Sequence, residues 1–169
     1  VPDTGKALLD LAAYYRNLFD IPVVAVTGSV GKTTTKDMIA SVVSQKYDTL
    51  WTQGNYNNEV GVPLTIFRIE EHHQAAIIEM GMNHFGEISR LTRAVAPTVG
   101  LITNIGVSHI ENLGSRAGIL QAKLEILEGM APDAPLIVNM DNDMLRTVKL
   151  GDRPLLTFAI DDQSASRNA

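Results

Sequence analysis

The sequence predicts an α/β fold in which a mostly parallel sheet is covered by helices on both faces. Short apolar runs rich in β-branched residues alternate with longer segments whose apolar residues recur at helical spacing. This alternation is typical of parallel sheets, because consecutive parallel strands are usually joined by a helix. Polar residues directly follow several of the apolar runs, and ligands of parallel sheets bind beyond the carboxyl ends of the strands.

The elements follow one another without an internal repeat or a low-complexity linker. We predict strands over residues 21–26, 49–52, 75–80, 99–103, 136–138 and 154–159. We predict helices over residues 3–19, 32–46, 62–69, 85–95, 115–130 and 141–148. Pro63 is tolerated in the first turn of its helix, and Pro97 stops the helix before it. Residues 161–169 are polar and predict a frayed tail.

Composition limits the class of protein. The 169 residues suffice for one domain with a core, and 45% hydrophobic with 20% charged residues is an ordinary globular balance. A net charge of −5 argues against a general nucleic-acid surface. No apolar run is long enough to cross a membrane, and without cysteine no disulfide or thiolate metal site is possible. These features favour a cytoplasmic protein, and because the first residue is Val1 we expect a piece of a longer chain.

The stretch 25-AVTGSVGKTTT-35 has the order required of a phosphate-binding loop. A strand runs into a glycine-containing turn, and a helix begins with lysine and threonines. Backbone amides at such a helix start can hold phosphate oxygens, lysine adds a positive charge, and the next hydroxyl can bind Mg²⁺. The strict phosphate-loop pattern would need glycine at position 26, where this chain has Val26. The alternative is a glycine turn with a solvated lysine.

The predicted loop contains eight candidate ATP-binding residues: Thr27, Gly28, Ser29, Val30, Gly31, Lys32, Thr33 and Thr34. Thr33 is placed to bind the metal, Thr34 could contact phosphate or cap the helix, and Thr35 is interpreted as structural.

Two further candidates follow predicted strands. Glu79 ends the run 75–80 and could hold Mg²⁺ directly or through water; the alternative is a surface carboxylate. His109 follows the strand 99–103 and could contact metal or phosphate, or could be a structural hydrogen-bonding residue.

The remaining polar residues give weaker signals. Spacing alone makes Lys123 a solvated helix residue paired with a nearby acid. Asn57 and Asn58 lie in GNYNNE, where asparagine suits turns as readily as ligands. We assign no function to His72 and His73.

Together these stretches resemble the central, ATP-binding domain of the Mur ligase family. The resemblance implies the phosphate-loop NTPase-like fold of that domain. The loop TGSVGKTTT has the form found in that family, which accounts for Val26. Four blocks carry the resemblance to the members that add D-alanyl-D-alanine: GNYNNEVGVPLT, EMGMNHFGEI, TNIGVSHIENLGS and AKLEIL. MurE and folylpolyglutamate synthetase share the loop without the first two of these blocks.

The resemblance implies an ATP-dependent ligase of peptidoglycan synthesis, and hence of cell-wall growth, cell shape and division. ATP phosphorylates the terminal carboxylate of UDP-MurNAc-tripeptide, and the amine of D-Ala-D-Ala attacks the acyl phosphate to form an amide. By resemblance Lys32 steadies the phosphates, while Thr33, Glu79, His109 and Lys123 hold Mg²⁺. The resemblance also implies that Lys123 is carbamylated by CO₂, which reverses the interpretation from spacing. It places Asn57 and Asn58 near the substrates.

The resemblance covers residues 20–145 and implies that this chain is partial. Members of the family have an N-terminal domain for the UDP sugar and a C-terminal domain that closes over ATP. We expect a lead-in helix or linker over residues 1–19, part of the central domain over 20–160 and a polar tail over 161–169. By itself such a chain would bind Mg·ATP at most and would not ligate.

Two alternatives of other classes are compatible with the sequence. A kinase or switch GTPase would share the loop, although no NKxD-type base-reading motif is present for a GTPase. A non-catalytic binding module could also retain the loop.

Overall fold

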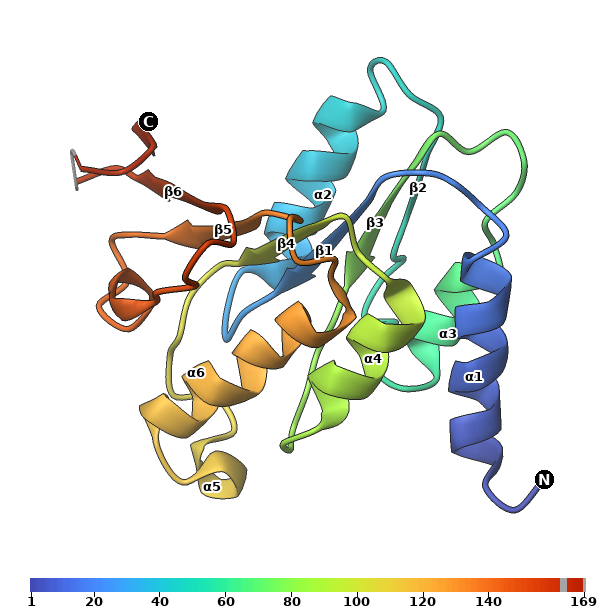
Figure 1. Cartoon of the computed structure of the whole chain (residues 1–169), viewed down its shortest axis with the longest axis horizontal. Coiled ribbons are helices and arrows are strands. Elements are labelled where there is room, and N and C mark those ends of the chain that lie inside the picture. The colour runs from blue at the N-terminus through green and yellow to red at the C-terminus, as the bar shows by residue number, and fades with distance from the viewer. Residues whose placement is uncertain (162–163, 169) are drawn as a thin grey trace.

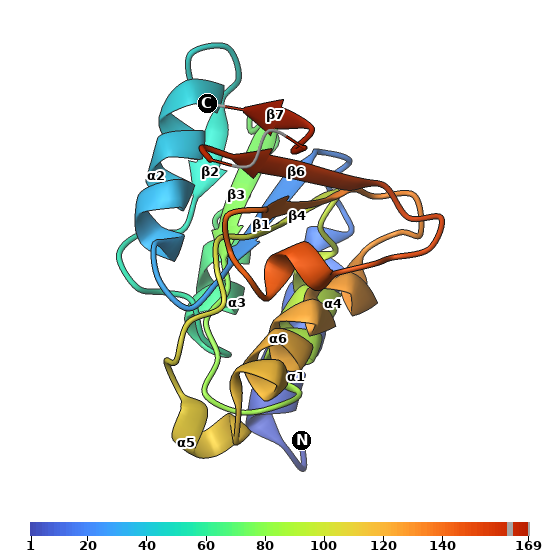
Figure 2. The ribbon, with the colours of Figure 1, turned by 90° about the vertical axis from the view of Figure 1, so that its left-hand side faces the viewer.

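The computed structural model describes residues 1–161 and 164–168 and contains one seven-stranded sheet whose strand pairs are all parallel (Figures 1 and 2). The strand order is β2-β3-β1-β4-β5-β6-β7. The strands are β1 (Val23–Thr27), β2 (Thr49–Trp51), β3 (Ala75–Glu79), β4 (Val99–Ile102), β5 (Leu136–Asn139), β6 (Leu155–Ala159) and β7 (Arg167–Asn168). The predicted fold class is therefore confirmed.

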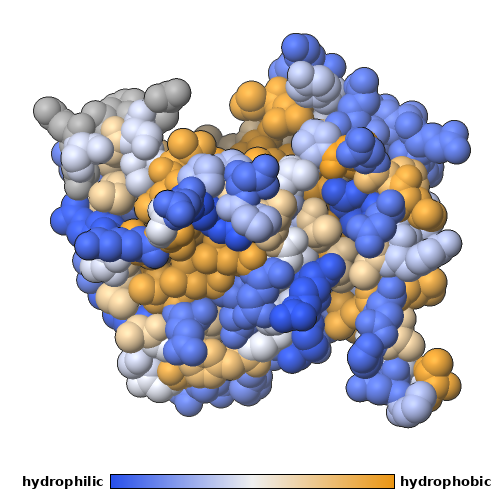
Figure 3. All heavy atoms as spheres, in the orientation of Figure 1, coloured by the Kyte–Doolittle hydropathy of each residue, from blue (hydrophilic) through white to orange (hydrophobic). Residues whose placement is uncertain are grey.

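Helices cover both faces of the sheet, as predicted, but unequally. Helix α2 (Lys32–Val43) packs its Ala40 on one face, against Val26, Ile77 and Leu101. The larger core lies on the other face under α1 (Thr4–Arg16), α3 (Gly61–Ile66), α4 (Glu87–Val95) and α6 (Arg116–Leu124). Figure 1 shows α2 on one side of the strands and these helices on the other. Apolar atoms gather at the surface over α2 in Figure 3, where Met38 and Val42 are exposed.

Helix α1 is built into the core through one buried cation. Arg16 is 6% exposed, and its guanidinium donates to the carbonyl oxygens of Val95, Phe19 and Ile21 at 3.1, 2.6 and 3.0 Å. Val95 is the last residue of α4, where helical carbonyls lack intrahelical partners and a positive charge is favourable. Arg16 thus stabilises the end of α4 and holds α1 against it.

The segment 115–130 is not the single helix that periodicity predicts. Helix α6 ends at Leu124, and a 3₁₀ helix follows over Glu125–Gly129. The side chain of Glu125 leaves the helix to accept hydrogen bonds from the amides of Gly86 and Ser89, at the start of α4, at 2.8 and 3.1 Å. A short helix α5 (Ile110–Leu113), absent from the prediction, precedes α6.

Two predictions near the end of the chain are wrong in detail. Residues 141–148 form only a 3₁₀ turn at Leu145–Thr147, because the side chains of Asn139 and Asn142 accept hydrogen bonds from nearby amides in place of a helical ladder. The sequence predicts a frayed tail, yet Arg167–Asn168 pairs with β6 as a seventh strand. Residues 162, 163 and 169 of that tail lie outside the described part of the chain. No helix of the described residues is long and apolar enough to span a membrane.

Candidate functional site

The predicted phosphate loop lies where β1 passes into α2, at the carboxyl edge of the sheet. Two glycines permit its shape. A Cβ on Gly28 would lie 1.9 Å from Thr103 Oγ1, so no larger residue fits. Gly31 has a left-handed backbone with φ of +78° and directly precedes α2. The loop therefore reverses sharply and leads straight into the first turn of a helix.

The start of α2 offers unpartnered donors. Its first amides have no intrahelical acceptor, and no side chain caps them. The hydroxyls of Thr33 and Thr34 are on the same exposed turn and make no hydrogen bond among the described residues. Amides, hydroxyls and the positive end of the helix dipole suit an anion with several oxygens.

Lys32 currently bends back onto its own loop. Its Nζ donates to the carbonyl oxygen of Gly28 at 3.0 Å. Burial lowers the pKa of Lys32, and the nearby negative charge of Glu79 raises it in part. A weak intraloop bond of this kind can be exchanged for a phosphate oxygen without moving the backbone.

Glu79 is a buried carboxylate with one unused oxygen. It ends β3, is 1% exposed, and its Oε1 accepts from Asn57 Nδ2 at 2.7 Å. Its Oε2 is buried without a hydrogen-bond partner, and Thr27 Oγ1 on the adjacent strand is in the same state. Buried polar atoms are usually satisfied, so two orphaned oxygens on neighbouring strands indicate a missing partner. Hard oxygen donors that include a carboxylate fit Mg²⁺.

Lys123 has an electrostatic state unusual for lysine. It is 2% exposed in the last turn of α6. Burial, the larger cause, and the positive charge of Lys32 together lower the pKa of Lys123 to about 7. Near neutral pH a large fraction of Lys123 is therefore an uncharged, nucleophilic amine, contrary to the solvated lysine that spacing predicts.

Interactions join most of these side chains, whereas none among the described residues joins the His109 side chain to them. Electrostatic coupling links Lys123 to Lys32 and Lys32 to Glu79, and a hydrogen bond links Glu79 to Asn57. His109 lies before α5 with a left-handed backbone, φ 64°, and its side chain makes no hydrogen bond to any described residue. Asn58 is occupied structurally, since its Oδ1 accepts from the amides of Val60 and Gly61 at the start of α3.

Two residues near Glu79 carried no sequence signal. Thr52 is fully buried and its Oγ1 accepts from the Glu79 amide at 3.0 Å. Lys36, 1% exposed, donates from Nζ to the Thr52 carbonyl at 2.7 Å and pairs with Asp37. Three threonines directly precede Lys36, but the local sequence gives no sign that Lys36 itself is buried. Its position on the buried side of α2 became evident only from the fold.

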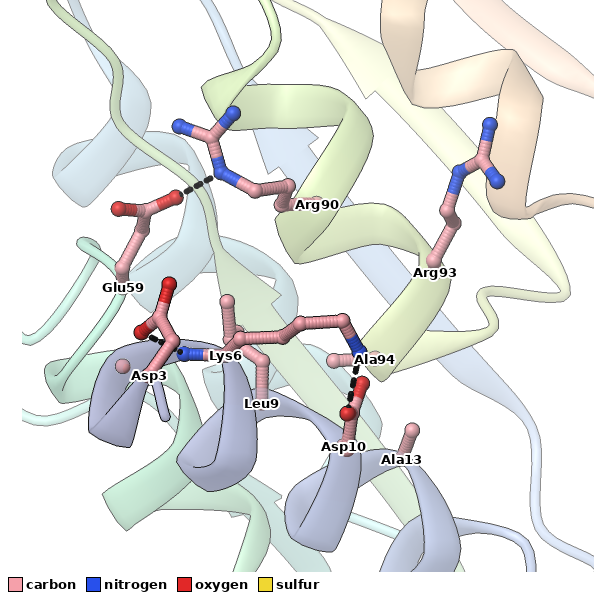
Figure 4. A pocket seen from close by; sticks show the side chains of 10 residues that line it. Asp3, Lys6, Leu9, Asp10, Ala13, Glu59, Arg90, Arg93 and Ala94 are labelled. Carbon is pink, nitrogen blue, oxygen red and sulfur yellow. Dashed lines mark hydrogen bonds and ion pairs between the residues drawn. The ribbon is translucent and has the colours of Figure 1, made fainter. Parts of the chain in front are cut away.

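A separate pocket lies between α1, α4 and the loop that bears Glu59 (Figure 4). It has a volume of about 680 Å³, and four of its charged lining residues pair with one another: Lys6 with Asp10 and Arg90 with Glu59. None of its lining residues belongs to the phosphate loop, to β3 or to α6. We therefore place the candidate site at the sheet edge and not in this pocket.

Comparison with known proteins gives a consistent result. Residues 26–169 match the Mur ligase middle domain. The chain is 48% identical over 145 residues to the UDP-N-acetylmuramoyl-tripeptide–D-alanyl-D-alanine ligase of Synechocystis, covering 86% of this chain and 32% of that one. It is 45% identical over 164 residues to the ligase of the same name from Bacillus subtilis, covering 97% and 34%.

A solved structure agrees. MurF ligase from Thermotoga maritima, crystallised in complex with ADP, superposes with a TM-score of 0.89 at 31% identity, covering 96% of this chain and 38% of that one. The chain thus spans about a third of the length of the relatives it matches. The residues that match the Mur ligase middle domain begin within β1 and span the phosphate loop, Glu79 and Lys123. The chain belongs to the Mur ligase family.

Proposed function

We propose that this chain forms the nucleotide-binding part of an ATP-dependent ligase that joins D-Ala-D-Ala to UDP-MurNAc-tripeptide in peptidoglycan synthesis. The observation that carries the proposal is the convergence of Lys32, Glu79 and Lys123 at one sheet edge. It occurs in a chain 45–48% identical to ligases named for this reaction. The reaction would take place in the cytoplasm, where ATP is made. Residues 20–160 would form part of the central domain.

The phosphates of ATP would be held by the loop of residues 27–34. The free amides at the start of α2 and the Lys32 ammonium supply donors and positive charge where phosphate oxygens need them. Phosphoryl transfer depends mainly on such positioning and charge neutralisation. Mg²⁺, when bound, would neutralise developing charge on the phosphates. Glu79, with its unpartnered Oε2, and the exposed Thr33 hydroxyl would hold it.

Lys123 would be carbamylated and would then act as an anionic ligand for a second Mg²⁺, with help from His109. The lone pair of the neutral amine attacks the carbon of CO₂, and the nitrogen loses one proton, which yields a carbamate anion. Only the uncharged amine can react, and a pKa of about 7 keeps that form abundant. The change places an anion near the Lys32 ammonium, where a protonated Lys123 would be repelled.

The acyl and amino substrates would approach from the loop that carries Asn57 and Asn58. Asn57 already orients the Glu79 carboxylate, so a substrate near it would lie beside the metal. The Oδ1 of Asn58 already accepts hydrogen bonds at the start of α3, so only its amide hydrogens are available to a ligand. The UDP sugar and D-Ala-D-Ala would be bound largely by the N- and C-terminal domains of the full enzyme.

A segment exchange tests the ligase function directly. The matching segment of the Bacillus subtilis ligase would be replaced by this chain, and ATP-dependent formation of the amide from UDP-MurNAc-tripeptide and D-Ala-D-Ala would be measured. We expect amide and ADP in equal amounts, and loss of both in the same chimera carrying Lys32→Ala. A folded chimera that binds Mg·ATP and forms no amide would contradict the proposal.

A further inference from the structure

The loop after β4 is joined to the phosphate loop by hydrogen bonds. Ser29 donates its amide to the carbonyl oxygen of Asn104 at 3.0 Å, and Val30 donates its amide to Asn104 Oδ1 at 3.0 Å. One residue therefore accepts from two consecutive amides of the phosphate loop. Because a backbone N–H can only donate, the carboxamide must present its oxygen to Val30, which fixes its orientation.

Three more hydrogen bonds join the two loops. Thr103 Oγ1 donates to the Val30 carbonyl at 2.6 Å, the Thr103 amide donates to the Thr27 carbonyl at 2.9 Å, and the Gly106 amide donates to Ser29 Oγ at 2.9 Å. The tip of the phosphate loop is thus held on both its amide and its carbonyl side.

The bracing loop is itself anchored in the fold. Ile105 is 1% exposed, and its carbonyl oxygen accepts from Arg116 at 2.8 Å and from Asn142 at 3.2 Å. Arg116 opens α6 and is paired in turn with Asp143. The position of Asn104 is therefore set by β4, α6 and the turn after β5, independently of any nucleotide.

These contacts divide the amides of the phosphate loop into two groups. Those of Ser29 and Val30 are already paired inside the protein, whereas the first amides of α2, beginning at Lys32, have no partner. A phosphate oxygen that took the Val30 amide would have to displace Asn104 and leave a carboxamide oxygen unpaired. The unpartnered amides of α2 can bind a phosphate without such a loss.

We propose that Asn104 is a positioning residue that holds the phosphate loop preformed and withdraws the Ser29 and Val30 amides from phosphate binding. The phosphates would then be bound by amides from α2 onward together with Lys32. The inference rests on the proposed function for the identity of the ligand, but the preformed loop is a property of the nucleotide-free protein. Preorganisation of this kind increases affinity, because the loop is not ordered at the expense of binding.

Backbone amide hydrogen exchange of the nucleotide-free protein, measured by NMR, tests the hold on the loop. We expect protected amides at Ser29 and Val30 and unprotected amides at Lys32 and Thr33. Asn104→Ala should reduce the protection of the Val30 amide about tenfold, the size of one lost hydrogen bond. Asn112→Ala is the matched control, because that exposed side chain makes no hydrogen bond to a described residue. Unprotected Val30 in the parent, or unchanged protection in Asn104→Ala, would overturn the proposal.

Asn104→Asp separates positioning from general stability. It retains an acceptor for the Val30 amide, so protection should persist, but it adds a negative charge beside the phosphates and should weaken Mg·ADP binding several-fold. Asn104→Ala should weaken Mg·ADP binding through loss of order. If Mg·ADP perturbs the Val30 amide more than those of Lys32 and Thr33, the proposal is wrong. If the parent binds no Mg·ADP, the proposed function fails, while exchange at Val30 still decides whether Asn104 preforms the loop.

Discussion

At the scale of single residues, the site is built from groups that the free protein does not satisfy. Glu79 and Thr27 each keep a buried oxygen without a partner, and burial opposes the positive charge on Lys123. Such groups reduce stability and are expected where binding of a ligand or a chemical modification later supplies the missing interaction.

Lys123 should make stability depend on pH in a defined direction. Its pKa is about 7 in the folded protein against 10.5 for an ordinary lysine, a difference worth about 5 kcal/mol. Below pH 7 both states carry the proton and the full cost of the buried charge applies. Between pH 7 and 10.5 the unfolded state binds more protons, so stability rises with pH.

Denaturant unfolding of the parent and of Lys123→Met, in buffer free of CO₂, measures this dependence. The stability of the parent relative to the variant should rise by about 3 kcal/mol from pH 7 to pH 9.5. A difference that does not change with pH would show that Lys123 is not buried as a free amine.

Glu79→Gln should separate stability from binding. Glutamine keeps an oxygen for Asn57 Nδ2 and removes a buried negative charge, so we expect the free energy of unfolding to change by less than about 1 kcal/mol or to increase. Mg·ADP binding should weaken at least tenfold, as measured by calorimetry. The control is Glu111→Gln, on an exposed residue of α5, which should alter neither quantity. Undiminished binding by Glu79→Gln would contradict the proposed role of this carboxylate in holding Mg²⁺.

At the scale of elements, helices are positioned by side chains that reach the ends of other helices. Glu125 accepts from the first amides of α4, and Arg16 donates to the last carbonyl of the same helix. An acid at the start and a base at the end both match the helix dipole. Since Glu125 lies just after Lys123, this contact also fixes α6 relative to the loop that follows Glu79.

Arg16→Met should show that α1 belongs to the folded unit and is not a loose linker. The variant keeps an apolar stem but leaves the carbonyls of Val95, Phe19 and Ile21 without their donor, which should cost about 3 kcal/mol of unfolding free energy. Arg68→Met, on an exposed arginine, should cost less than about 0.5 kcal/mol. Equal effects of the two variants in urea unfolding would contradict this role of α1.

At the scale of the whole molecule, the fold follows from local pattern far better than the site does. The strands β1, β3 and β4 are short apolar runs between helices, and that alternation leaves few topologies other than a parallel sheet. Position along the chain indicated Glu79 because a carboxylate ending a buried strand must face the ligand edge.

The remaining site features depend on contacts between segments distant in sequence. Spacing alone predicts that Lys123 is solvated, since nothing in the local sequence reveals that the fold buries it. Side-chain hydrogen bonds to backbone atoms distant in sequence define three of these features. The separations are 74 residues for Asn104, 27 for Thr52 and 16 for Lys36. The helix predicted over residues 141–148 is wrong for a related reason. Asn139 accepts a hydrogen bond from the Asp141 amide, and Asp141 accepts one from the amide of Ile160, which lies just after β6 and distant in sequence.

Calorimetric titration with Mg·ATP, beside Lys32→Ala, tests the central claim most directly. We expect the parent chain to bind with one site and Lys32→Ala to lose that binding, because the variant keeps the loop but not its cation. Equal binding by parent and variant would contradict a phosphate site at the β1–α2 junction.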